Sequence, residues 1–202
     1  MRRLLISAVA CGALLVSACG TSASARLAKD LIPAPALESP AWGLRVASNG
    51  RALNPFGIQP SGAPLAPAIV SKAKTVASRQ WVHGDGALRA GPLPESIFSV
   101  IDQATQFGSA AGANALVTAL SGAYGSSSSQ PVAGTPGATV LTAPFAADVP
   151  GGQVTGREEL VVVERGAYVF TVLVVGGGSR PTAADAQALA SLQAKAVPAS
   201  LE

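Results

Sequence analysis

Few side chains in this sequence can carry acid–base or metal chemistry. The 202 residues include one histidine, His83, and two cysteines, Cys11 and Cys19. His83 precedes Asp85 in the stretch WVHGDG, and the two could begin a metal site or an acid–base pair. A metal site needs more ligands than this pair offers, so we interpret His83 as a residue at a strand end, beside a turn. We expect no metal ion and no cofactor.

Serine catalysis lacks a recognisable pattern. Serines cluster at 126–129, but the chain contains no G-x-S-x-G motif. A Ser-His-Asp triad would have to use His83, and nothing marks a partner serine. The sequence therefore predicts no catalytic residues and a protein that is not an enzyme.

The stretch GGGSRPT (176–182) runs from an expected strand into an expected helix. Such a junction can bind an anion, because the first N–H groups of a helix point outward, and Arg180 would help. The glycine spacing fails the dinucleotide-binding fingerprint. We interpret the stretch as a flexible turn followed by a helix that starts at Pro181.

Three acids, Glu158, Glu159 and Glu164, could be considered as a calcium site. Successive residues of a strand point to opposite faces, so Glu158 and Glu159 cannot share one ion. We interpret these acids as the solvated edge of a strand.

The chain opens with MRRLLISAVACGALLVSACG, where two arginines precede an uncharged apolar run of 13 residues, Leu4 to Val16. A membrane-spanning helix needs about 20 apolar residues, so the run is too short to span and has the layout of a secretory signal. The small residues Ser17 and Ala18 then precede Cys19. VSAC resembles the bacterial lipobox, in which the cysteine sulfur receives a diacylglycerol and the chain is cut just before it. The alternative is an ordinary signal peptide with a chance cysteine.

Processing at Cys19 would remove Cys11, Arg2 and Arg3, leaving 12 Lys and Arg against 11 Asp and Glu. The basic balance then nearly vanishes, and no footprint for nucleic acid remains. Two or more acyl chains, such as diacylglycerol with palmitate, hold a protein firmly on a membrane. We expect a lipid-anchored protein on the outer face of the plasma membrane.

Composition divides the chain into three parts: a lipoprotein signal peptide at 1–18, the lipidated Cys19 with a flexible tether at 19–41, and one extracytoplasmic domain at 42–202. The tether is rich in Ser, Ala and Pro, and its end, AKDLIPAPAL, could dock as a short turn. Four prolines between 54 and 70 exclude a regular element there and predict a surface loop.

The rest of the domain predicts an α+β fold, a twisted antiparallel sheet of about five strands flanked by helices in the order β-β-α-β-β-β-α. A strand from about residue 74 ends at the Gly-Asp-Gly turn. The stretch 95–107 fits either a helix or a strand, and its β-branched and aromatic content favours the strand. A helix over 110–124 capped by Ser109, a short strand over 138–145, a hairpin over 157–178 turning at Gly166, and a final helix to Ala194 complete the order.

The succession of RQWVHGDG, GSAAGANALVTAL, PGATVLTAPF, VVVERGAYVFTVLVVG and AQALASLQAKAVP resembles small actinobacterial envelope lipoproteins with a twisted antiparallel sheet flanked by helices. It is also similar to the PsbP-like group of α+β domains and to the sensor domains of mycobacterial-type receptor kinases, although it lacks the disulfide cysteines of the latter. The resemblance covers roughly residues 74–198. It implies a non-enzymatic binding or scaffolding role at the cell envelope, and it carries no functional residue across.

Two function hypotheses follow. The first is a binding or interaction domain for a protein or cell-wall partner. The alternative is a carrier of a lipid or another apolar small molecule, held in a groove between helix 110–124 and the sheet. The aromatic residues are expected to be core anchors or interface residues: Trp42, Phe56, Trp81, Phe98 and Phe145.

Overall fold

The computed structural model describes residues 23–50, 72–125 and 129–197. Cys19, Phe56 and the expected signal peptide lie outside the described residues. The helical elements are α1 (Ala23–Leu27), the 3₁₀ turn η1 (Ala28–Asp30), α2 (Ala34–Leu37), α4 (Ala110–Tyr124) and α5 (Ala183–Ala196). The strands are β1 (Arg45–Gly50), β2 (Ala73–Val82), β3 (Gly91–Pro92), β4 (Ile97–Phe107), β5 (Ser129–Pro131), β6 (Ala138–Val149), β7 (Gly152–Arg165) and β8 (Tyr168–Gly176).

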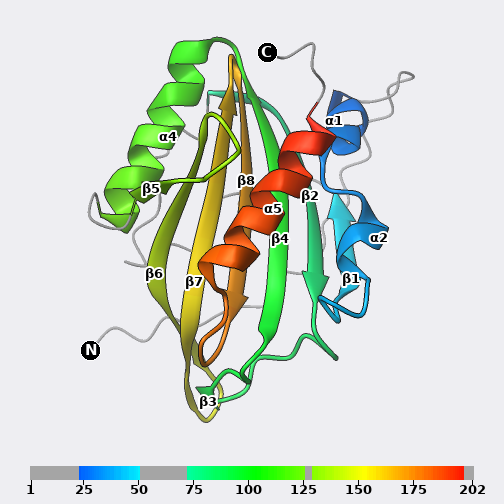
Figure 1. Cartoon of the computed structure of the whole chain (residues 1–202), viewed down its shortest axis with the longest axis vertical. Coiled ribbons are helices and arrows are strands. Elements are labelled where there is room, and N and C mark those ends of the chain that lie inside the picture. Colours follow the sequence, from blue (N-terminus) through cyan, green and yellow to red (C-terminus); the bar gives the residue numbers. More distant parts are fainter. Residues whose placement is uncertain (1–22, 51–71, 126–128, 198–202) are drawn as a thin grey trace.

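The strands form one open, mostly antiparallel sheet of eight strands, so the α+β prediction is confirmed (Figure 1). Seven strands follow the order β1-β2-β4-β8-β7-β6-β5, and β3 pairs in parallel with β7. The expected count of about five was too low, because it omitted β1 and two very short strands. β3 has 2 residues and β5 has 3, too few for a sequence pattern to reveal.

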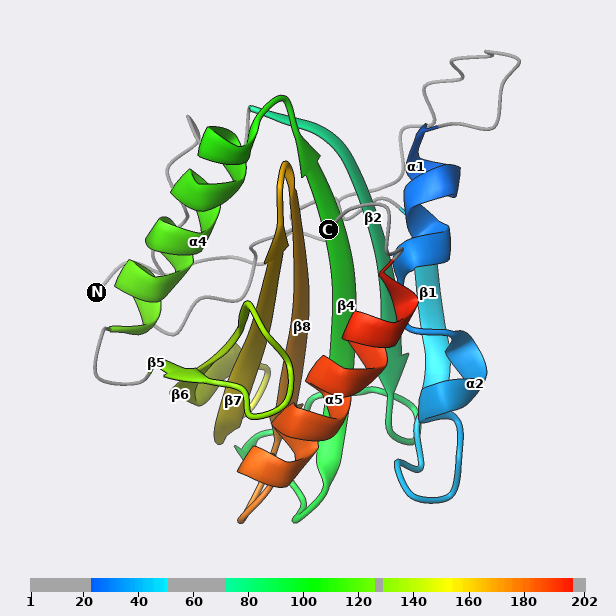
Figure 2. The same cartoon turned by 45° about the horizontal axis from the view of Figure 1, so that its top comes forward.

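Helices cover both faces of the sheet (Figure 2). Helix α4 covers one face, where its buried residues Ala113, Leu116 and Leu120 share a core with Phe107, Leu160 and other sheet residues. On the other face α5 and the N-terminal helices share a second core, whose largest fully buried side chains include Trp81, Phe170, Leu31 and Leu189. Successive residues of a strand point to opposite faces of the sheet, so each strand contributes side chains to both cores.

Local chemistry explains the elements that the sequence predicted. The side chain of Ser109 caps α4 by accepting a hydrogen bond from the Gly112 N–H at 3.3 Å. The ambiguous stretch 95–107 forms strand β4, buried on both faces. β7 and β8 form the expected hairpin, in which Arg165 pairs with Tyr168 and Gly166 has a φ of 56°. Val172, in the middle of β8, is fully buried.

Strand β6 runs past Pro144, where the sequence predicted an end. β5 covers only residues 139–141 of β6, so from Thr142 onward β6 is the edge of the sheet. Proline lacks an N–H and is tolerated in a strand at such an edge. The stretch VPGGQVTG forms the β6–β7 turn and the start of β7.

The N-terminal segment differs most from expectation. Residues 23–27, expected to form part of a flexible tether, and residues 28–37, expected to dock at most as a short turn, lie on the sheet as α1, η1 and α2. Their apolar side chains are buried beside Trp81: Leu27, Leu31, Ile32 and Leu37. Burial of four such side chains outweighs the Ser, Ala and Pro content that indicated a tether.

Polar contacts fix this segment in place. The Ile32 N–H donates to Asp102 Oδ2 at 2.5 Å, and the Ile32 carbonyl accepts from Arg79 Nη1 at 2.5 Å. Arg79 and Asp102 are partners across β2 and β4, so one cross-strand pair binds both backbone polar groups of Ile32. Trp81 Nε1 donates to the Ala34 carbonyl at 3.2 Å. The segment is therefore part of the folded domain.

Replacing Asp102 with alanine should lower the free energy of unfolding by about 3 kcal/mol, because the buried Ile32 N–H loses its charged acceptor and the buried Asp102 side chain leaves a cavity. Urea denaturation measures this change. Asp148→Ala is the matched control, since Asp148 is exposed on β6 and should cost less than about 0.5 kcal/mol. Equal stability of the two variants would contradict the role of Asp102.

Candidate functional site

His83 and Asp85, paired in the sequence analysis, are not joined by a hydrogen bond or an ion pair within the described residues. Both are exposed in the loop after β2. The Asp85 carboxylate instead accepts from the Ala87 N–H at 2.9 Å and pairs with Arg89 at 3.1 Å. The Ala87 hydrogen bond, ahead of smaller effects, lowers the pKa of Asp85. This carboxylate stabilises its own loop.

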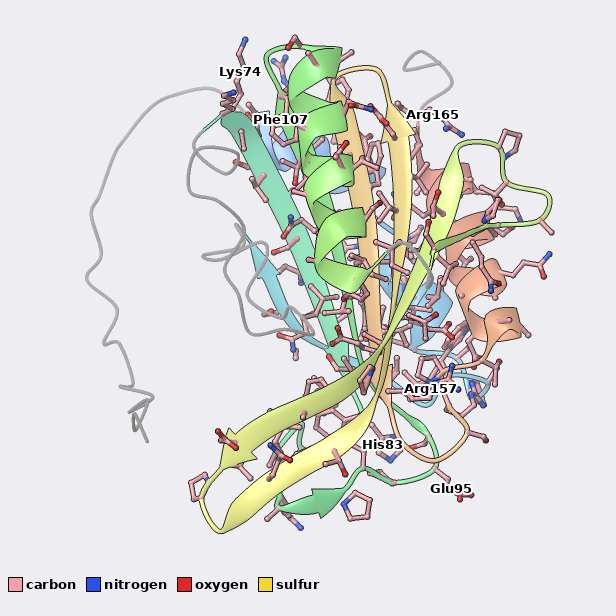
Figure 3. The ribbon with its side chains drawn as sticks, turned by 90° about the vertical axis from the view of Figure 1, so that its left-hand side faces the viewer. Lys74, His83, Glu95, Phe107, Arg157 and Arg165 are labelled. Carbon is pink, nitrogen blue, oxygen red and sulfur yellow. The ribbon has the colours of Figure 1, made fainter. Side chains whose placement is uncertain are left out.

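His83 lines a surface pocket of about 390 Å³ near the β3–β4 connection (Figure 3). The described lining contains no serine, cysteine or second histidine: His83, Gly84, Asp85, Ala87, Arg89, Ala90, Pro92, Leu93, Pro94 and Phe98. Across residues 23–50, 72–125 and 129–197, no group of three or more His, Cys, Asp or Glu is placed to hold a metal ion. The pocket is wide, but it offers a single imidazole.

The glycine run before α5 is not the expected flexible turn. A side chain on Gly176 or Gly177 would collide with backbone atoms of the segment that leads into β4, so these glycines permit a close crossing. The helix begins at Ala183 with Thr182 as its N-cap, two residues later than the predicted start at Pro181. Packing against residues 93–96 fixes the turn.

Arg180 does not present a free cation to an anion site. Its guanidinium donates to both oxygens of Asp185 at 2.6 Å, and Asp185 also completes the capping box with Thr182. The charge of Arg180 is therefore balanced by Asp185 in the first turn of α5.

Glu158 and Glu159 lie on opposite sides of β7, as the alternation of a strand requires. The expectation that they form a solvated edge is wrong, because only 1% of Glu158 and 3% of Glu159 is exposed. Both lie beneath helices that come from distant parts of the chain. Burying a carboxylate is costly unless it is paired, so each position needs its own explanation.

Glu159 lines a pocket of about 340 Å³ beside the start of α5, here called the Glu159 pocket. The sheet contributes Thr142, Arg157 and Glu159, and α5 contributes Ala183 and Gln187. The remaining lining residues belong to β5, β6 and the turn between them: Gln130, Pro131, Val132, Ala133 and Val140. Charged, amide and hydroxyl groups therefore meet in one hollow.

Two opposite charges stand side by side in the Glu159 pocket. Arg157 Nη2 lies 3.6 Å from Glu159 Oε1; the arginine side chain is 48% exposed and the glutamate side chain 4%. The second oxygen, Oε2, is buried and has no hydrogen-bond partner among the described residues. Burial raises the pKa of Glu159, although Arg157 opposes the rise. The pocket thus holds a hydrogen-bond acceptor that the described fold leaves unsatisfied, next to a partly exposed donor.

Glu158 occupies the α4 face, where its neighbour is Tyr124 at the end of α4. Burial raises the pKa of Glu158 to about 7, and the nearby Tyr124 hydroxyl lowers it in part. Burial and the Glu158 carboxylate together raise the pKa of Tyr124. Glu158 lines neither the Glu159 pocket nor the pocket beside His83. We interpret Glu158 as a buried acid of the core.

Comparison with known proteins gave no match to a family model, a curated protein or a solved structure. No helix in the described part of the chain is long and apolar enough to cross a membrane.

The sequence did contain a partial signal for the site. Arg157 and Glu159 are two residues apart in a strand, so they must lie on one face. Nothing local indicates that α5 and β5 then close over that face, because these elements follow from tertiary packing.

Buried acids predict how stability responds to pH. Burial raises the pKa of Asp102 and of Glu158 to about 7 in the folded protein. Between about pH 4 and pH 7 the folded state holds protons that the unfolded chain has released, so stability falls as pH rises through this window. Glu158→Gln should flatten the fall and stabilise the protein at pH 7.5 by on the order of 2 kcal/mol.

Thermal melts at pH 4.5 and 7.5 test this expectation. Glu95→Gln, which alters an exposed acid, is the control and should keep the slope of the parent. A parent protein that is no less stable at pH 7.5 than at pH 4.5 would refute the assignment of proton-binding acids to the core.

Proposed function

We propose that this chain is a lipid-anchored envelope protein whose α+β domain binds a polar ligand in the Glu159 pocket without turning it over. The anchor part rests on the sequence, where the apolar run and VSAC precede Cys19. The binding part rests on one observation, the unsatisfied Oε2 of buried Glu159 beside Arg157. Buried polar atoms are normally hydrogen-bonded, so an orphaned one in a pocket fits a missing partner.

The chemistry of the pocket favours a ligand with a donor and an acceptor close together. A carbonyl or carboxylate would reach the half-exposed Arg157, and an N–H group of the same ligand would meet the 4% of the Glu159 side chain that is exposed. Peptide groups carry both, so the ligand class we assign is a short peptide, such as the peptide part of a cell-wall component. A volume of about 340 Å³ lies within the ordinary range of small-ligand pockets.

The apolar-carrier alternative has less support. Helix α4 buries its inward residues directly on the sheet, and both described pockets lie elsewhere and have charged residues in their lining. Docking of a protein through an apolar patch also has little support, because Leu88 is the one large apolar side chain exposed within the described residues.

A binding role fits the pocket better than catalysis does. The lining offers no histidine, lysine or cysteine to exchange a proton with Glu159 or to act as a nucleophile. His83 belongs to the other pocket.

Cys19→Ala tests the anchor. Without the cysteine sulfur no diacylglycerol can be attached, so the protein should leave the membrane fraction or remain with its signal uncut. Fractionation of the host cells and intact-mass measurement report both outcomes. A variant that is processed and still sediments with membranes would refute the anchor.

Glu159→Gln tests the pocket, using the full lipidated chain in detergent and a panel of defined tripeptides followed by native mass spectrometry. Losing a charged acceptor should weaken the tightest peptide about 10-fold or more. Glu158→Gln is the matched control, because the same substitution one residue away faces the other side of the sheet. Equal affinities for the two variants would exclude the pocket, and recovery of cleaved peptide would exclude a purely binding role.

A further inference from the structure

Exposed cations gather at one end of the sheet, here called the basic end. Its members are Arg26 in α1, Lys29 in η1, Lys72 and Lys74 at the start of β2, and Lys195 in the last turn of α5. All five are exposed. The described ion pairs involve other cations, namely Arg89, Arg157 and Arg180.

The topology explains why these residues meet. β2 starts where β4 ends, since Ala73 pairs with Phe107. The last turn of α5 lies against η1, because Gln193 Nε2 donates to the Asp30 carbonyl at 2.8 Å. The β7–β8 hairpin also turns at this end and adds Arg165. Two acids accompany these cations: Asp30 follows Lys29, and Glu164 precedes Arg165.

The opposite end of the molecule carries the exposed acids. Asp85 lies in the loop after β2, Glu95 leads into β4, and Asp148 is near the β6–β7 turn. Figure 3 shows Lys74 and Arg165 at one end of the sheet and Glu95 at the other. Arg45 and Arg89 are also exposed at this end, where Arg45 donates to the Gly84 carbonyl and Arg89 pairs with Asp85. The three acids outnumber these two cations, so the excess of positive charge lies at the basic end.

The chain also leads toward Cys19 at the basic end. Helix α1 starts at Ala23, four residues after Cys19. Four residues reach at most about 14 Å when fully extended. Asp102 and Arg79 hold the docked segment on the sheet. The distance between Cys19 and the sheet can therefore grow beyond this limit only if those contacts break.

We propose that the basic end docks on a bilayer surface that carries anionic phospholipid head groups. This inference rests on the lipid anchor at Cys19. A polybasic patch beside acyl chains supplies a second membrane signal, and each cation near an anionic surface strengthens the contact. Docking presents the acidic end and the mouth of the His83 pocket away from the membrane.

The test uses the full acylated chain in vesicles of phosphatidylcholine alone or with about 30% phosphatidylglycerol, a composition that gives a strong negative surface. A donor dye is placed on Ala25→Cys at the basic end or on Ala146→Cys in β6, both exposed positions. An acceptor dye sits on a head group. Energy transfer from position 25 should rise in the anionic vesicles and fall again in 0.5 M salt, used as roughly a threefold excess over physiological ionic strength. Transfer from position 146 should not rise.

Lys72→Gln with Lys74→Gln should lower the ratio of docked to undocked protein about 25-fold, at about fivefold per cation. Arg45→Gln with Arg89→Gln removes two charges elsewhere and should leave the ratio unchanged. If acylated protein gave the same energy transfer in both kinds of vesicle, the docking surface would be refuted and the lipid anchor would stand. Equal effects of the two double variants would have the same meaning. A chain that floats without acyl mass on Cys19 would overturn the anchor and this inference together.

Discussion

The hydrogen bonds that Asp102 and Arg79 make to the backbone of Ile32 hold the N-terminal segment on the sheet and so complete one of its two cores. These two residues are partners on neighbouring central strands, so their spacing is set by the β2–β4 ladder. They bind the N–H and the carbonyl of a residue 70 positions from Asp102, which otherwise would be two buried polar groups without partners. Because both backbone groups of Ile32 are hydrogen-bonded, Leu31 and Ile32 can enter the core beside Trp81. That burial closes the face of the sheet that α5 leaves uncovered (Figure 2).

The two adjacent glutamates show how one strand can serve two purposes. Glu158 is enclosed under α4 with Tyr124 and has the character of a buried core acid. Glu159 opens toward a hollow between the sheet and α5, and Arg157 on the same face balances part of its charge. The difference does not come from residue type, since the side chains are identical. It comes from which helix lies above each face, and from whether that helix leaves space.

Much of the architecture was predictable from the sequence, because it depends on short-range patterns. Ser109 and the apolar stripe that follows it predicted α4, and Gly166 between two β-branched runs predicted the β7–β8 hairpin. The docked N-terminal segment was not predictable, since Ile32 and Asp102 are far apart and the local composition resembles a linker. The Glu159 pocket was not predictable either, because its walls also come from residues far apart in the sequence. Arg157 and Glu159 were visible as neighbours on one face, but the helix start and the β5 turn that enclose them arrive from elsewhere in the chain.

The docked segment also changes how the domain would respond to force. A pull on residue 23 would not stretch a slack linker; it would pass through Ile32 into the hydrogen bonds of Arg79 and Asp102, and from them into β2 and β4. These strands lie inside the sheet, each paired on both sides. Load shared across several ladders resists rupture better than load on an edge strand, because many hydrogen bonds must yield together. A pull on residue 23 would therefore load β2 and β4 together, and the docked segment and the sheet would move as one body.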